Sequence, residues 1–303
     1  FRGLHRQHKK DISAFTTLST LEREALKKKY QIRQVEPEKV SRGKGVTKTA
    51  LKLADGKMIE TVMMRLGGGK NTICVSSQIG CPVRCYFCAT GKMGFKRNLT
   101  AGEILAQVYH FSEKNEITNV VFMGMGEPFL NYENVMKAAR ILNHPLGMGI
   151  AARKIVISTV GIISGIKKMA QEKEQFRLAW SLVSPFDEIR KELIAHRSLN
   201  SITQTLDAIR DYQRRTGRRI TIEYVVMDGV NDRRRDTEEL IVIAKALDCH
   251  VNLIAYNPTF GAHYKPGNVP AMYSQLIKRG INATVRKSLG AEINAACGQL
   301  IAH

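Results

Sequence analysis

The sequence has few cysteines, little negative charge and no long hydrophobic run. Six cysteines among 303 residues are too few for a disulfide scaffold, which indicates a reducing compartment. No stretch approaches the roughly 18 consecutive apolar residues that span a bilayer, and the chain begins at Phe1 without an initiator Met or the apolar core of a signal peptide. We therefore expect a cytoplasmic protein with no membrane partner, whose natural N-terminus is missing.

The scarcity of negative charge indicates the first partner to expect. The chain has 47 Lys and Arg residues against 27 Asp and Glu, which gives a formal net charge of +20. With 44% hydrophobic residues the composition is that of a globular protein, and it excludes a disordered or collagen-like chain. We expect contact with a polyanion. The basic runs at 214–219 and 233–235 can bind phosphates, although solvated helix ends explain them equally well.

From about residue 72 onward, short β-branched runs alternate with amphipathic segments. This alternation predicts parallel βα units with right-handed crossovers, and hence an α/β fold in the form of a partial barrel of the (βα)6 type. In such a barrel the chemistry lies at the carboxyl ends of the strands. The predicted strands are 72–76, 119–123, 154–159, 177–183, 219–227, 250–256 and 281–286. The predicted helices are 101–112, 134–143, 202–216 and 236–247.

These patterns divide the chain into four segments. Residues 1–40 form a small helical accessory segment, cut short at its start, in which Ser19 or Thr20 is the expected cap of a helix. Residues 41–73 read as a β-hairpin extension with a turn at Gly67–Gly69. Residues 74–287 form the partial barrel, and residues 288–303 form a C-terminal segment.

Three cysteines crowd into eight positions directly after the first strand of the barrel. Cys81, Cys85 and Cys88 have the spacing C-x3-C-x2-C, with Phe87 before the third cysteine. Ordinary iron–sulfur clusters take four thiolates, so three cysteines leave one iron with an open position for a small ligand. The alternative is a structural zinc with Cys74 as the fourth thiolate, in a non-catalytic RNA-binding protein.

The three-cysteine loop resembles the motif of the radical S-adenosylmethionine (SAM) superfamily. In that superfamily SAM binds the open iron, and its reduction releases a 5′-deoxyadenosyl radical. Further stretches resemble the RlmN/Cfr family of 23S rRNA adenine methyltransferases from about residue 56 to residue 301. They are Cys74–Cys81, Gly94–Thr100, Met123–Pro128, Asn252–Pro258 and Ala295–Leu300.

The resemblance implies cofactors and roles for individual residues. The cofactors are a [4Fe-4S] cluster on Cys81, Cys85 and Cys88, and SAM. Cys297 matches the cysteine that is methylated, Cys74 the cysteine that forms a disulfide with it, and Glu60 the proton acceptor. The SAM-binding positions are Gly126, Glu127, Ser158, Ser181, Leu182, Val183 and Asn257. The family usually has His where this chain has Val183. At this position we therefore expect a contact with SAM through the backbone and not through the side chain.

The resemblance also implies a reaction and partners. The preferred reaction is methylation of C2 of an adenosine in 23S rRNA, with tRNA as a second candidate substrate. The stretches at 157–163 and 184–186 look more like the Cfr branch, which methylates C8 and confers antibiotic resistance. A reducing electron donor such as flavodoxin is the other expected partner, and we expect a monomer.

Overall fold

The computed structural model describes residues 1–7, 9–30, 32, 35–196 and 199–301. Parts of the predicted segments 1–40, 74–287 and 288–303 therefore lie outside the described residues. Within the described residues, no helix is long and apolar enough to cross a membrane.

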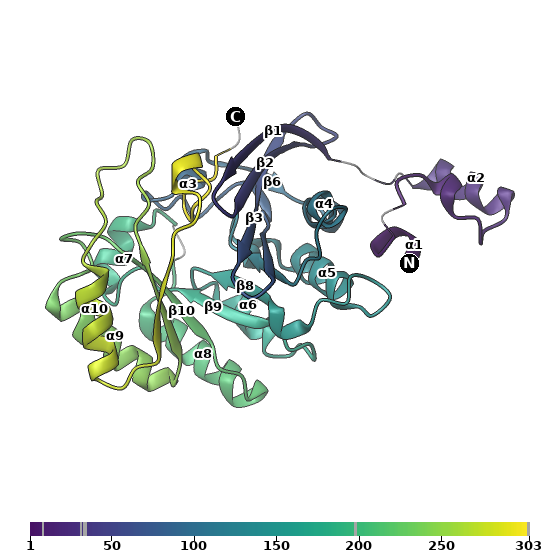
Figure 1. Cartoon of the computed structure of the whole chain (residues 1–303). Coiled ribbons are helices and arrows are strands. Elements are labelled where there is room, and N and C mark those ends of the chain that lie inside the picture. The colour runs from purple at the N-terminus through teal and green to yellow at the C-terminus, as the bar shows by residue number, and fades with distance from the viewer. Residues whose placement is uncertain (8, 31, 33–34, 197–198, 302–303) are drawn as a thin grey trace.

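A ten-stranded sheet forms the centre of the molecule (Figure 1). Its order is β1-β2-β3-β4-β7-β8-β9-β10-β11-β12, and every pair from β4 to β12 is parallel. This mostly parallel sheet confirms the predicted α/β partial barrel. The parallel strands are β4 (Lys70–Cys74), β7 (Asn119–Phe122), β8 (Ile155–Thr159), β9 (Arg177–Ser181), β10 (Thr221–Val226), β11 (His250–Ala255) and β12 (Ala283–Arg286).

The predicted extension is larger than a hairpin. Strands β1 (Glu36–Gly43), β2 (Val46–Lys52) and β3 (Met58–Leu66) form an antiparallel meander that joins the barrel through β4. Strand β1 begins at Glu36, before the predicted start of the extension at residue 41. The sequence does not indicate this start, because the residues of β1 are almost all exposed and show no apolar alternation. It lies at the edge of the sheet, and its register shifts between Pro37 and Lys39.

Helices cover the outer face of the sheet (Figure 1). The four predicted helices are confirmed. Other helices on the barrel carry no clear signal, because they are short or have a proline in their first turn. The predicted ones are α4 (Ala101–Ser112), α5 (Tyr132–Asn143), α8 (Ile202–Thr216) and α9 (Arg234–Leu247). The others are α6 (Ile163–Met169), α7 (Asp187–Leu193) and α10 (Val269–Lys278). Capping boxes fix the starts of α4, at Thr100 and Glu103, and of α8.

The N-terminal helices lie to one side of the barrel, next to α4 and α5 (Figure 1). They are α1 (Arg2–His5) and α2 (Thr20–Lys29), and Ser19 caps α2 as expected. Helix α2 buries no residue, so its apolar side chains do not hold it to the barrel. Polar contacts attach this segment instead: His5 Nδ1 lies 2.6 Å from the Tyr109 hydroxyl, and Lys10 pairs with Glu113 at 2.6 Å.

Two small strands and a short helix carry the cysteine loop. Strand β5 (Gln78–Gly80) pairs antiparallel with β6 (Phe95–Asn98), and helix α3 (Ala89–Lys92) lies between them in the chain. The buried core packs between the large sheet and its helices, with Phe122, Phe176 and Trp180 among its largest side chains.

Phe122→Ala is expected to lower the free energy of unfolding by about 3–5 kcal/mol, because it leaves a cavity in the core beside strand β7. Chemical denaturation under anaerobic conditions measures this difference. Val242→Ala is the control: Val242 is 57% exposed, and its loss should change stability by no more than about 0.5 kcal/mol. Equal effects of the two substitutions would contradict this account of the core.

Candidate functional site

The cysteine loop follows β5 and is held by its own backbone. The Cys81 N–H donates to the Gly94 carbonyl (3.2 Å), and the Cys88 N–H donates to the Cys85 carbonyl (3.1 Å). Gly80 makes the turn into the loop with a φ of 70°, and a Cβ there would collide with the Gly94 carbonyl oxygen.

The three thiols need a cation to ionise. Burial raises the pKa of Cys81 to about 12, and burial also raises the pKa values of Cys85 and Cys88. Cys88 also raises the pKa values of Cys81 and Cys85, and Cys81 raises the pKa of Cys85, which places the three thiols within electrostatic reach of one another. An iron–sulfur cluster supplies the missing positive charge, because a coordinated thiol is deprotonated. The donor set therefore fits an iron–sulfur cluster.

The structure does not place Cys74 with the loop cysteines, as the zinc alternative requires. Cys74 ends strand β4 between Val62 and Val121. The charged groups that shift its pKa are Cys297 and Arg286 rather than the loop cysteines.

Two glycines and a glutamate follow β7, as the sequence predicts. Gly124 and Gly126 pass so close to Val75 and Gln78 that a Cβ would lie 2.7 Å from the Val75 oxygen and 2.6 Å from the Gln78 Cβ. The Glu127 carboxylate accepts from the N–H groups of Val160 (3.0 Å) and Phe129 (3.1 Å). Burial raises the pKa of Glu127 to about 7, against the opposing effect of these donors.

The next two strand ends meet side by side. Ser158 at the end of β8 and Ser181 at the end of β9 have their hydroxyl oxygens 3.2 Å apart. Leu182 is fully buried, and Val183 adopts a φ of 67° in a three-residue turn that the Ser184 N–H closes on the Leu182 carbonyl (2.8 Å). A β-branched residue in the left-handed region is strained. The Val183 side chain packs in the core.

A buried asparagine holds this strained turn. Asn231 follows β10, and its Nδ2 donates to the carbonyls of Val183 (2.6 Å) and Val225 (2.7 Å). Its Oδ1 accepts from the Met227 N–H at 2.7 Å. The side chain therefore fixes the loop after β9 to the loop after β10.

The C-terminal segment crosses the barrel beside α3 (Figure 1). Asn257, after β11, donates through Nδ2 to the Cys297 carbonyl (3.2 Å). The Ala89 N–H donates to the Gly298 carbonyl at 2.7 Å. At the far end the Ile301 N–H donates to the Glu60 carboxylate (2.8 Å), whose other oxygen pairs with Lys48 at 2.8 Å. Glu60 is thus buried and paired rather than on a solvated strand face.

Cys74 and Cys297 line one small cavity of about 30 Å³ together with Arg286. All six cysteines of the chain are free thiols in this structure. Burial and the nearby Cys297 raise the pKa of Cys74 to about 12, and Arg286 opposes them. Cys297 and Glu223 in turn raise the pKa of Arg286, which pairs with Glu223 at 3.5 Å and donates to the Met123 sulfur at 3.3 Å.

Sequence reasoning missed Asn231 and Arg286. Arg286 is the last residue of β12, so the rule that chemistry gathers at strand ends could have indicated it. Asn231 lies in the turn Asp228–Asp232, where an Asn is ordinary and gives no such signal.

Comparisons with known proteins agree with this geometry. The Radical SAM superfamily matches residues 75–241. The chain is 48% identical to ribosomal RNA large subunit methyltransferase N of Nitrosopumilus maritimus, over 84% of this chain and 76% of that protein. It is 44% identical to a probable dual-specificity RNA methyltransferase RlmN of Deinococcus deserti, over 95% and 87%. The crystal structure of a radical SAM methyltransferase from Sphaerobacter thermophilus has a TM-score of 0.91 at 42% identity, covering 99% and 91%.

Identity above 40% over most of both chains shows the family and not the fold alone. The superfamily uses a [4Fe-4S] cluster and SAM, which fits the loop cysteines and the strand ends described above. The chain therefore belongs to the RlmN family of radical SAM RNA methyltransferases, enzymes that depend on a [4Fe-4S] cluster and SAM.

Proposed function

We propose that the enzyme adds a methyl group to C2 of an adenosine in 23S rRNA and that it also acts on tRNA. The relatives support both parts, because one is named for the large ribosomal RNA and others are named as dual-specificity RNA methyltransferases. RlmN names also favour C2 over the C8 alternative.

Methylation at C2 needs a carbon radical. C2 lies between two ring nitrogens and is electron-poor, so it does not attack the methyl group of SAM as a nucleophile would. When bound, the cluster and SAM supply a 5′-deoxyadenosyl radical that removes a hydrogen atom from a methyl group. We assign Cys81, Cys85 and Cys88 to the cluster, as the three half-buried thiols of one loop.

We assign the SAM pocket to the strand ends. The loop of Gly124 and Gly126, which packs closely on Val75 and Gln78, would bind the methionyl group, and the cationic amine there would keep Glu127 ionised in spite of its burial. Ser158 and Ser181 offer adjacent hydroxyls, Leu182 and Val183 offer backbone groups, and Asn257 links the pocket to Cys297.

Cys297, Cys74 and Glu60 carry the methyl transfer. The Cys297 sulfur bears the methyl group, and its methylene radical forms a bond to C2. Glu60 then accepts the ring proton, and the adduct gives up one electron, for which a bound cluster would be the acceptor. Finally the Cys74 sulfur attacks the Cys297 sulfur, the bond between sulfur and methylene breaks, and a disulfide forms while a proton completes the methyl group.

One observation carries this proposal: Cys74 and Cys297 line the same cavity, beside the cation of Arg286. The disulfide therefore requires only a local movement of the C-terminal segment. Arg286 favours a negatively charged sulfur, which is the form that attacks.

The reaction is tested by nucleoside mass spectrometry. Unmodified 23S rRNA and tRNA are incubated anaerobically with the reconstituted enzyme, SAM and a reductant. We expect 2-methyladenosine in both RNAs. A product of 8-methyladenosine would assign the enzyme to the Cfr branch, and no product despite SAM cleavage would refute the proposed substrates.

Cys297→Ala and Cys74→Ala are expected to fail at different steps. The first should abolish methylation and form no bond to RNA, because the methyl carrier is gone. The second should accumulate a covalent protein–RNA adduct, because no thiol can release it. Denaturing gels with labelled RNA separate these outcomes. Cys249→Ala is the control, since Cys249 is a buried thiol of the core, and it should retain activity. Full activity of either site variant would refute the mechanism.

Asn231→Ala is expected to weaken SAM binding about tenfold or more, because leaving a buried carbonyl without its donor costs about 1–3 kcal/mol. Val183→Gly removes the backbone strain of the turn that Asn231 stabilises. In the Val183→Gly protein, Asn231→Ala should therefore weaken SAM binding much less. Calorimetry gives the dissociation constants of the four proteins in this cycle. Asn143→Ala, which removes a bond to the Ile150 carbonyl elsewhere, is the control. Strictly additive effects would show that Asn231 does not act through Val183.

A further inference from the structure

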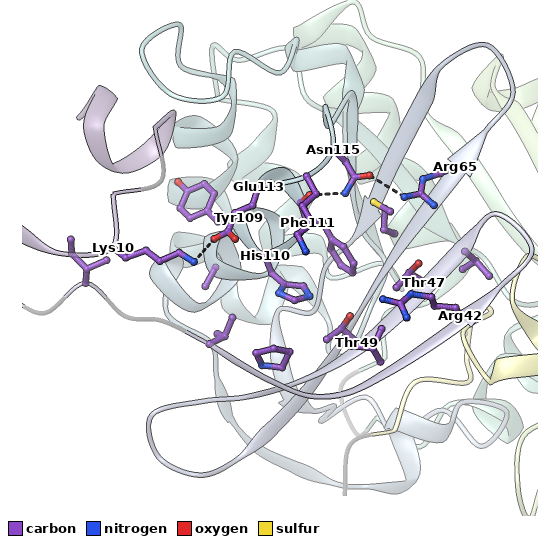
Figure 2. A pocket seen from close by; sticks show the side chains of 18 of the residues that line it. Lys10, Arg42, Thr47, Thr49, Arg65, Tyr109, His110, Phe111, Glu113 and Asn115 are labelled. Atoms are coloured by element: carbon purple, nitrogen blue, oxygen red, sulfur yellow. Dashed lines mark hydrogen bonds and ion pairs between the residues drawn. The ribbon is translucent and has the colours of Figure 1, made fainter. Parts of the chain in front are cut away.

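A cleft of about 630 Å³ lies outside the reaction site, between helix α4, the strands β1–β3 and the N-terminal segment (Figure 2). Its volume falls within the range of about 300–1,000 Å³ that is usual for ligand sites. Five cationic side chains line it against a single carboxylate, Glu113, and Lys10 pairs with that carboxylate. The cleft is therefore strongly positive.

Three of these cations are exposed and have no acidic partner among the described residues. They are Arg42, Arg65 and Lys114. Lys9 also forms no ion pair there, but it is half-buried and donates to the Ala14 carbonyl. The basic runs elsewhere differ: Arg214 and Arg215 pair with Asp211, and other arginines of these runs also pair with acidic side chains. Cations in the basic runs are thus largely neutralised within the protein, whereas the cleft retains its charge for an external anion.

The floor of the cleft is apolar and includes an unused hydroxyl. Met63 and Phe111 are buried there, and the ring of Phe111 lies beside that of His110, with centroids 4.8 Å apart (Figure 2). Burial lowers the pKa of His110, and Lys10 and Lys114 lower it further against the effect of Glu113, which favours the neutral ring. Thr49 is fully buried, and its Oγ1 has no hydrogen-bond partner in the described structure. Such a floor suits a planar heterocycle with polar edges.

The cleft and the reaction site lie on opposite faces of strands β2 and β3. Side chains alternate between the two faces of a strand, so Lys48 and Glu60 face the C-terminal segment while Thr47, Thr49 and Met63 face the cleft. Strand β1 is the free edge of the sheet between these faces. A flexible chain whose target base enters the barrel can pass around this edge and reach the cleft.

We propose that this cleft binds a single-stranded segment of the RNA substrate that flanks the target adenosine, with phosphates on Arg42, Arg65 and Lys114 and an unstacked base on the apolar floor. Phosphates are bound by Lys and Arg, and splayed-out bases stack on rings and apolar surfaces. This inference rests on the proposed function for the identity of the RNA and deepens it by naming where the flanking RNA lies.

The test compares two double variants with the same change in net charge. Arg42→Glu with Arg65→Glu alters the cleft. Lys245→Glu with Lys278→Glu alters exposed cations at the ends of α9 and α10 that form no ion pair with a described residue. The probe is a labelled RNA hairpin with the target adenosine in its loop and a single-stranded flank, and its binding is measured by fluorescence anisotropy over a range of salt. Thermal unfolding checks that both variants fold.

We expect the cleft variant to bind at least tenfold more weakly and the control to stay within about twofold of the original protein. The negative slope of log affinity against log salt should become shallower by about 1.4 in the cleft variant. The two substitutions remove two phosphate contacts, and each contact with a single strand contributes about 0.7 to the slope. Equal losses in the two variants, or none in the cleft variant, would overturn the proposal.

Photocrosslinking gives a second test that needs no substitution. With 4-thiouridine in the flank of the hairpin, crosslinks should map to peptides containing residues 46–49 or 106–111; crosslinks confined to the barrel loops would overturn the proposal. The two proposals fail separately. If the unaltered enzyme methylates the RNA but binds it independently of Arg42 and Arg65, only the cleft is refuted. If binding depends on them but no methylated adenosine forms, only the proposed function is refuted.

Discussion

The site depends on one constraint: the short C-terminal segment must keep Cys297 close both to the cysteine loop and to Cys74. Hydrogen bonds from Ala89 and Asn257 hold this segment beside the cysteine loop, and its bond to Glu60 holds the end that lies against β3. These attachments are few and polar, so they fix a position without burying a large apolar surface. Glu60 is at once an anchor of the segment and, in the proposed mechanism, the base, so protonation of its carboxyl would also loosen that anchor.

The rest of the architecture serves the same placement. Parallel strands bring their carboxyl ends to one edge, which gathers the Gly126 loop, Ser158, Ser181 and Asn257 from distant parts of the chain. The antiparallel strands β1–β3 extend this sheet beyond the barrel, so one face of β2 and β3 completes the reaction site while the opposite face forms the floor of the cleft. A single sheet thus connects the chemistry with a basic surface.

The sequence predicts the barrel well because its strands are buried runs of β-branched residues and its long helices have an apolar face. It predicts less about the extension, since the exposed residues of β1 leave no pattern, and nothing about the seven-residue helices α6 and α7. For the site, the cysteine loop and the strand-end residues follow from motifs. The bond of Glu60 to the Ile301 N–H and the approach of Arg286 to Cys74 do not, because each joins residues more than two hundred positions apart.

The exposed edge strand β1 has a consequence for the behaviour of the protein at high concentration. An unpaired edge offers backbone groups to a strand of another molecule, which is a common route to aggregation. Strand β1 carries Pro37, a register shift beside it, and the like charges of Lys39 and Arg42. Each of these features disfavours the addition of a further strand. The charges that make this region attractive to a polyanion therefore also keep copies of the protein apart.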